Sequence, residues 1–84
     1  MEETAMQSAR AEAEISERAS RFLKAELKRA DVTYKELAKR LKEFGLDETR
    51  DSIASKLKRG TFPATFFLAC CGALKLESLR LEDI

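Results

Sequence analysis

The segment from Thr33 to Leu74 most constrains the fold of this chain. It contains two short amphipathic stretches separated by a connector with Gly45, and Gly60 closes the second stretch. Pro63 then opens a third stretch that is almost wholly apolar. Glycine is favoured directly after a helix and proline in the first turn of one, so this order predicts three consecutive helices.

Capping residues give the expected boundaries of these helices. Thr33, with Glu36 three residues later, forms a capping-box pattern at the start of the first helix. Asp47 and Thr49 are alternative N-caps for the second helix. The predicted helices therefore cover residues 34–44, 50–59 and 63–74.

A further helix is predicted before this segment, over about residues 10–30, because apolar residues recur there at three- and four-residue steps. The members of this apolar face are Ala11, Ile15, Ala19, Phe22, Leu23, Leu27 and Ala30. Residues 1–12 are acidic and small and lack a strong apolar stripe, so we expect a flexible N-terminal tail. The remaining residues, 13–84, are enough for one domain with one modest core.

Expected core residues lie at the inward positions of the two short helices and on the apolar helix that follows. They are Leu37, Ala38, Leu41, Phe44, Ile53, Leu57, Phe66 and Leu74. Because residues 64–74 are apolar on all sides, that helix must be either central or covered by a second molecule. The apolar C-terminal residues Leu76, Leu79, Leu81 and Ile84 could form a short helix or an extended segment over the core.

The surplus of apolar residues near the C-terminus also predicts an interface. Contiguous exposed apolar surface usually marks a contact with another protein, and a two-fold dimer is the commonest closed arrangement. We therefore expect a homodimer or a protein partner at an interface that contains Phe66, Phe67, Leu79 and Leu81. The competing explanation is that the C-terminal segment covers the apolar helix within one chain.

Charge is distributed unevenly along the chain. Residues 1–17 carry a net charge of −4, residues 18–60 carry +6, and residues 61–84 carry −1. A basic centre suits a surface that contacts phosphate groups, although a solvated helical surface with salt bridges is an equal alternative. We expect a cytoplasmic protein without a membrane partner, because no apolar run spans a bilayer and no secretory signal is visible.

Catalysis is not expected from this composition. The chain contains no histidine, and its acidic residues alternate with basic ones at helix-surface spacing. Cys70 and Cys71 are adjacent and lack the spacing of a metal site, so both are expected to be buried small apolar residues. The sequence therefore predicts no metal, cofactor or small-molecule substrate.

Three motifs carry a resemblance to a known family. The segments ELAKRL (Glu36–Leu41) and IASKLKRG (Ile53–Gly60), and the Pro63 helix that ends in ALKLESL, resemble the lambda-repressor-like, XRE-type helix-turn-helix regulators. The resemblance covers about residues 20–82 and is closest to a small bacterial branch of that fold. It implies an all-α, lambda-repressor-like domain of four to five helices. The chain departs from the family in a longer connector between the two short helices and in Lys75, where the family usually has glycine.

The resemblance implies a transcriptional regulator that binds DNA through the helix at residues 50–59. The implied base contacts are Thr49, Arg50, Ser52, Ser55 and Lys56. Candidate phosphate contacts are Lys39, Arg40, Lys42, Lys56, Lys58 and Arg59. Because acidic residues crowd the start of this helix, the alternative is an antiactivator or antitoxin that reuses the helix-turn-helix fold to sequester a regulator or another protein.

Overall fold

The computed structural model describes the backbone of residues 2–84 and the side chains of residues 10–84. The described chain forms four α-helices and one short 3-10 helix: α1 (Glu2–Ala30), α2 (Tyr34–Glu43), α3 (Arg50–Arg59), α4 (Ala64–Ala73) and η1 (Leu81–Asp83). Residues 2–84 contain no β-strand, which confirms the all-α prediction.

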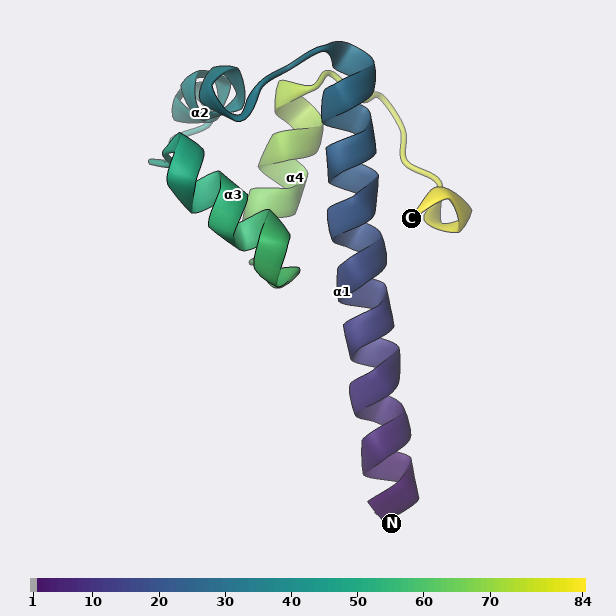
Figure 1. The fold of residues 1–84 in the computed structure, drawn as a ribbon. Coiled ribbons are helices and arrows are strands. Elements are labelled where there is room, and N and C mark those ends of the chain that lie inside the picture. The colour runs from purple at the N-terminus through teal and green to yellow at the C-terminus, as the bar shows by residue number, and fades with distance from the viewer. Residues whose placement is uncertain (1) are drawn as a thin grey trace.

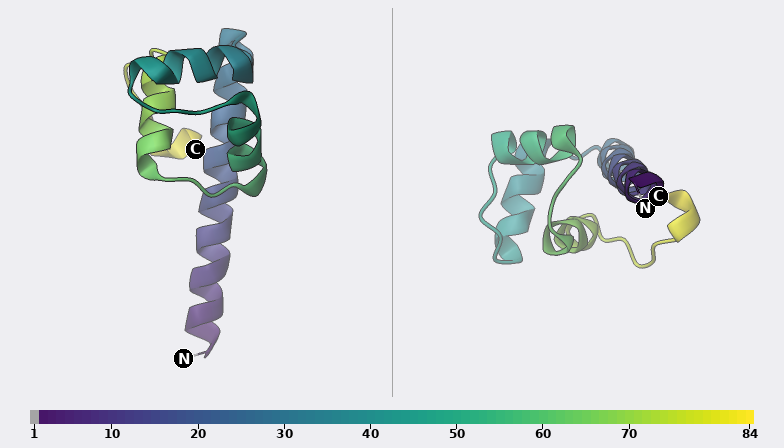
Figure 2. Two further views of the ribbon diagram at one scale, coloured as in Figure 1. Left: turned by 90° about the vertical axis from the view of Figure 1, so that its left-hand side faces the viewer. Right: turned by 90° about the horizontal axis from the view of Figure 1, so that it is seen from below.

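The helices α2, α3 and α4 are grouped beside the C-terminal half of α1 (Figure 1). Helix α2 packs against α3 and α4, and α1 packs against the same two helices. The N-terminal half of α1 extends away from this group (Figure 1 and the left view of Figure 2). The molecule is therefore elongated, with extents of 45 × 25 × 20 Å.

Apolar side chains from all four helices form one core. Five of the predicted members are each 2% exposed or less: Leu37, Leu41, Ile53, Leu57 and Phe66. Leu74 is half-buried and packs against them. This part of the predicted core is confirmed, because residues spaced three or four apart share one face of a helix.

The prediction for α1 was wrong at its N-terminal end. The helix begins at Glu2 instead of near residue 10. On its predicted inward face Leu23 and Leu27 are buried, whereas Ile15 is 59% exposed and Ala11 and Ala30 are also exposed. Periodicity identifies a face of a helix but does not tell how far the neighbouring helices extend along it. The flexibility of residues 1–12 stays a prediction, and Met1 lies outside the described residues.

Helices α1, α2 and α4 end in the same type of turn. Asp31, Gly45 and Lys75 have positive φ angles of 57°, 82° and 59°. The backbone N–H that follows each one donates a hydrogen bond back into the helix, for example from Leu46 to the carbonyl oxygen of Leu41 at 3.1 Å. This is the Schellman arrangement, and the apolar residue after each turn packs against the core.

Lys75 has the left-handed conformation at the position where the related regulators usually have glycine. A side chain in this conformation is strained, because its Cβ approaches the following carbonyl oxygen. Lys75→Gly is therefore expected to raise the free energy of unfolding by about 0.5–1 kcal/mol. This is the relief of strain minus the larger conformational entropy that glycine loses on folding. Urea denaturation measures the change. Lys75→Ala keeps the Cβ and is the control, and an equal gain in both variants would contradict this explanation.

Helix α4 packs against α1 and α2 of the same chain. The C-terminal segment, which the single-chain alternative placed over this helix, instead ends beside α1. The α4 residues Phe66, Ala69, Cys70, Cys71 and Ala73 are buried. Phe44, which was predicted to face inward, is 51% exposed, so that prediction was wrong. Its ring lies over the surface of α4, because a Cβ added to Gly72 would lie 2.9 Å from two ring carbons of Phe44.

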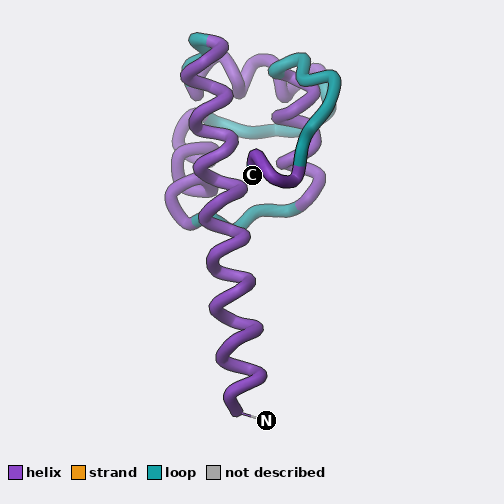
Figure 3. Tube along the Cα trace, turned by 90° about the vertical axis from the view of Figure 1, so that its right-hand side faces the viewer, coloured by secondary structure: helices purple, strands orange, loops and turns teal. Residues whose placement is uncertain are grey.

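The C-terminal segment combines the two predicted alternatives. It leaves α4 as an irregular stretch and then forms the single turn η1 (Figure 3). The segment ends beside α1, where Asp83 and Ile84 line a depression together with Phe22 and Ala25. Part of the apolar C-terminus is therefore covered within one chain, with Leu76, Leu79 and Ile84 half-buried.

Candidate nucleic-acid interface

Helix α3 packs through one face and exposes the other. Ile53 and Leu57 are its buried residues. Because successive helical residues turn by about 100°, the opposite face carries Ser55 and Arg59, both of which are exposed. This outer face, together with the start of α3, is where the sequence predicted contacts to bases.

Two of the predicted base-contact residues form the N-terminal cap of α3. Thr49 is the N-cap, and its hydroxyl oxygen accepts a hydrogen bond of 3.0 Å from the backbone N–H of Ser52. The hydroxyl oxygen of Ser52 accepts one of 2.8 Å from the backbone N–H of Thr49. It also donates one of 2.7 Å to the carboxylate of Glu48. Both hydroxyls therefore already have partners that stabilise the helix end.

Lys56 is held by an ion pair within the chain. Its Nζ donates hydrogen bonds of 2.8 and 3.0 Å to the two carboxylate oxygens of Glu48. The pair is largely buried, with 22% of the Lys56 side chain and 12% of the Glu48 side chain exposed. The same ammonium lies 5.6 Å from the centre of the Phe66 ring, within the range of a cation–π contact. Lys56 is thus committed to a contact that joins the connector, α3 and α4.

The balance of these contacts lowers the pKa of Glu48 below its ordinary value of 4.5. Burial disfavours the carboxylate and by itself would raise the pKa, but hydrogen bonds from Lys56 and Ser52 and the charge of Lys56 together outweigh it. A carboxyl group with a lowered pKa in the folded state contributes stability above its unfolded pKa. This contribution is lost as the pH falls through the folded pKa.

Glu48→Gln is expected to lower the free energy of unfolding by about 1 kcal/mol at neutral pH, because a neutral amide accepts a weaker hydrogen bond from Lys56. The difference from the parent protein should shrink as the pH falls below the ordinary value of 4.5. Urea denaturation at several pH values measures both effects. Glu43→Gln changes an exposed carboxylate at the end of α2 and is the control. A deficit that does not depend on pH would show that the charge of Glu48 is not its cause.

The other predicted contact residues differ in whether their side chains already have a partner within the chain. Arg59 donates a hydrogen bond of 2.9 Å to the hydroxyl of Thr61 and a second one to its backbone oxygen. Arg50, Ser55 and Lys39 are exposed, and none has a side-chain hydrogen bond or ion pair to any side chain that the structure describes. Lys58 is exposed and unpaired in the same sense. Although acidic residues surround it in the sequence, Arg50 has no ion pair with any of them among the described residues.

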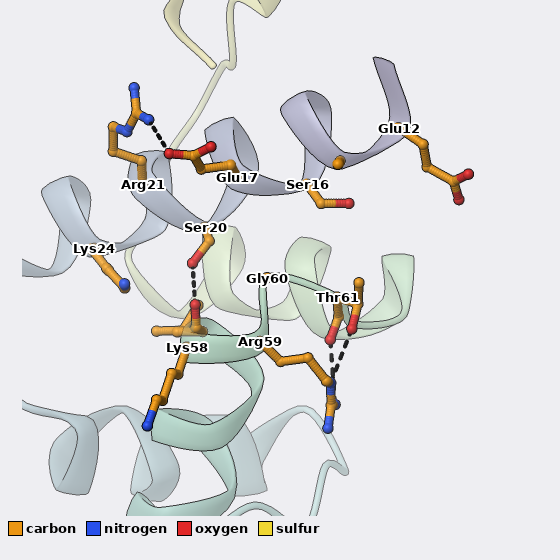
Figure 4. Close-up of a pocket in the computed structure, with 12 residues that line it drawn as sticks. Glu12, Ser16, Glu17, Ser20, Arg21, Lys24, Lys58, Arg59, Gly60 and Thr61 are labelled. Atoms are coloured by element: carbon orange, nitrogen blue, oxygen red, sulfur yellow. Dashed lines mark hydrogen bonds and ion pairs between the residues drawn. The ribbon is translucent and has the colours of Figure 1, made fainter. Parts of the chain in front are cut away.

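A groove of about 500 Å³ lies between α1 and the C-terminal end of α3 (Figure 4). Lys24 of α1 and Lys58 of α3 line the same end of it. Ser20, which is buried, donates a hydrogen bond to the backbone oxygen of Leu57 and holds the end of α3 against α1. The basic surface at this end of α3 thus continues onto α1, which the local spacing of charges in the sequence did not reveal.

The residues of the predicted protein interface are not all at the surface. Phe66 is 2% exposed, so its predicted surface role was wrong, whereas its predicted place in the core is confirmed. The Phe67 ring is half-buried and stacks against Phe62 at a centroid distance of 6.3 Å. Leu79 is half-buried, and Leu81 is 82% exposed.

The two cysteines are buried thiols. Burial, followed by the proximity of Cys71 and of the Glu48 charge, raises the pKa of Cys70 to about 12. Burial also raises the pKa of Cys71. Both are protonated at neutral pH, and a thiol is a poor nucleophile and metal ligand. No cluster of three or more potential metal ligands occurs among the described residues.

Comparison with known proteins identifies one family. A family model described as "Domain of unknown function (DUF6471)" matches residues 16–79, which is most of the chain. No curated protein and no solved structure matches the chain. Within the described residues, no helix has the length and apolar character needed to cross a membrane.

Proposed function

The chain belongs to the DUF6471 family, and we propose that it is a small helix-turn-helix regulator that binds DNA through α3. One observation carries this proposal. Helix α3 packs through Ile53 and Leu57. It exposes Arg50 in its first turn and Ser55 and Lys58 on its other faces, without a partner among the described side chains. A helix held by a second helix and exposed along its length has the form needed to enter a major groove.

The contacts around α3 change which of the predicted residues would contact DNA in this proposal. Arg50 is the residue for base recognition, because a free guanidinium can donate two hydrogen bonds to one guanine. Lys58 and Lys39 are the phosphate contacts, because both ammonium groups are exposed. In this proposal Thr49, Ser52 and Lys56 support the shape of α3 instead of contacting DNA.

Selection of duplexes from a random pool, followed by fluorescence anisotropy at several salt concentrations, tests the proposal. We expect one enriched sequence to bind more tightly than unrelated duplexes, and affinity to fall as salt rises. Lys58→Ala should weaken all duplexes alike and reduce the salt slope by about one unit. Lys75→Gly, which removes a cation outside α2 and α3, is the control and should leave both quantities unchanged. No enrichment and no binding at low salt would contradict a DNA-binding function.

An exposed apolar patch, made of Phe44 after α2 and Leu68 on α4, supports a second candidate function. Leu68 is 64% exposed and lies one turn before Gly72 on α4. The half-exposed ring of Phe44 lies beside Gly72. Exposed Asp47 and Asp51 at the start of α3 disfavour phosphate and suit a basic protein surface.

The second candidate is an antiactivator or antitoxin that sequesters another protein through this patch. It predicts that the parent protein retains a specific partner from the source cytoplasm, and that Leu68→Ser loses this partner while keeping its helical circular dichroism spectrum. Leu81→Ser changes another exposed leucine and is the control. Retention of the same partner by Leu68→Ser would exclude the patch as the binding surface.

A further inference from the structure

The charges of α1 are separated along its length. Residues 2–17 contain five glutamates and one arginine, a net charge of −4. Residues 18–30 contain five basic residues and one glutamate, a net charge of +4. Among the side chains that the structure describes on α1, the exposed charged ones are Arg10, Glu12, Glu14, Glu17, Arg18, Arg21, Lys24, Lys28 and Arg29. Helix α1 therefore has an acidic half that extends beyond the other helices and a basic half that packs against them.

Most of the acidic half of α1 lies beyond the other helices, and among its described side chains only Ser16 is half-buried, beside Gly60. This half extends away from α2, α3 and α4 (Figures 1 and 3), and Ala11, Ala13 and Ile15 on it are exposed. A helical segment of this length without packing contacts is only marginally stable in water. A second helix beside it would supply the missing contacts.

The groove between α1 and α3 offers a place for such a helix. Ser16 and Ser20 line its inner part, where the end of α3 already packs against α1, and the exposed small residue Ala13 lines its open part, where a second helix can approach closely. The charged side chains of the groove are unevenly placed: Lys24 and Lys58 lie at one end, and Glu12 and Arg59 lie toward the other (Figure 4). Its basic end is complementary to an acidic helix.

We propose that two copies of this chain pair through α1 in antiparallel orientation. Each copy places the acidic half of its α1 in the groove of the other, beside Lys24 and Lys58. A two-fold axis makes the two contacts equivalent. A parallel pair would set acidic halves against each other and basic halves against each other, which is unfavourable. This interface differs from the one expected at α4 and the C-terminal leucines. Because it engages Lys58, pairing competes with the phosphate contact that the proposed function gives to this side chain.

Charge reversal of either half separately tests the pairing. The first variant, E12K/E14K/E17K, makes both halves of α1 basic, and the second, R18E/K24E/K28E, makes both halves acidic. All six side chains are exposed, so both variants are expected to fold, which circular dichroism checks. In sedimentation equilibrium at micromolar concentration we expect the parent protein to have twice the mass of the 9.5 kDa chain. Each variant alone should be monomeric, and an equimolar mixture of the two should be dimeric, because only the mixed pair restores opposite charges along both contacts.

The control variant, E43K/D47K/D51K, changes the net charge by the same amount as the first variant but on α2, the connector and α3. It should remain dimeric, because its substitutions lie outside α1. High ionic strength should weaken the dimer of the parent protein by screening these exposed charges. A monomeric parent protein would overturn the proposal. Dimers of either reversed variant alone, or a mixture that stays monomeric, would also overturn it.

Discussion

Replacing Leu57 with alanine is expected to lower the free energy of unfolding by about 2–5 kcal/mol. Leu57 is 2% exposed and lies in α3, where it faces the core that all four helices share. Truncation removes apolar contacts and leaves a cavity that surrounding helices fill only in part. In a domain of this size each kcal/mol corresponds to about 4–8 °C in melting temperature, so the variant should melt far below the parent protein.

Thermal and urea denaturation followed by circular dichroism measure this loss. Leu81→Ala makes the same chemical change at a side chain that is 82% exposed, and it should change stability by less than about 0.5 kcal/mol. Equal stability of Leu57→Ala and the parent protein would mean that α3 does not pack against the core as described.

Replacing Arg50 with alanine is expected to weaken binding of the preferred duplex by about 1–3 kcal/mol. The affinity for unrelated duplexes should fall much less, because the lost contact is mainly to a base edge and not to phosphate. Arg50 is the first residue of α3, is exposed and has no ion pair with any described side chain. Its guanidinium is therefore free to bind guanine through two parallel hydrogen bonds.

Arg50→Lys is the matched variant for this prediction. It keeps the positive charge but cannot form the planar double hydrogen bond, so it should retain non-specific affinity and lose most of the preference. Anisotropy titrations of the enriched and an unrelated duplex measure both quantities. Unchanged preference in both variants would exclude Arg50 from base recognition.

Local sequence signals predicted the boundaries of the helices after residue 33 well. Thr33 and Thr49 cap α2 and α3, and Gly60 closes α3 with a positive φ angle. These features were predictable because a cap involves residues only three or four positions apart. The left-handed Lys75 could not be found from residue type, because lysine has no preference for that conformation.

The sequence patterns did not predict contacts between residues that are far apart in the chain or on different elements. The ion pair between Glu48 and Lys56 joins residues eight positions apart across the start of α3, so helical spacing does not predict it. The ion pair changes the candidate site, because the Lys56 ammonium is bonded to Glu48 and is no longer free to contact DNA. The extent of α1 beyond the other helices was missed for a related reason: periodicity carries no information about where the packing partners end.

Helix α3 is the proposed DNA-binding surface, and a nuclear magnetic resonance titration of the ¹⁵N-labelled protein with the enriched duplex tests this proposal most directly. The backbone amides of α3, from Arg50 to Arg59, and those near Lys39 should show the largest chemical-shift changes at substoichiometric DNA. Amides around Phe44 and Leu68 should change little. The largest changes around Phe44 and Leu68, or no changes at any ratio at low salt, would contradict the assignment of α3 as the DNA-binding helix.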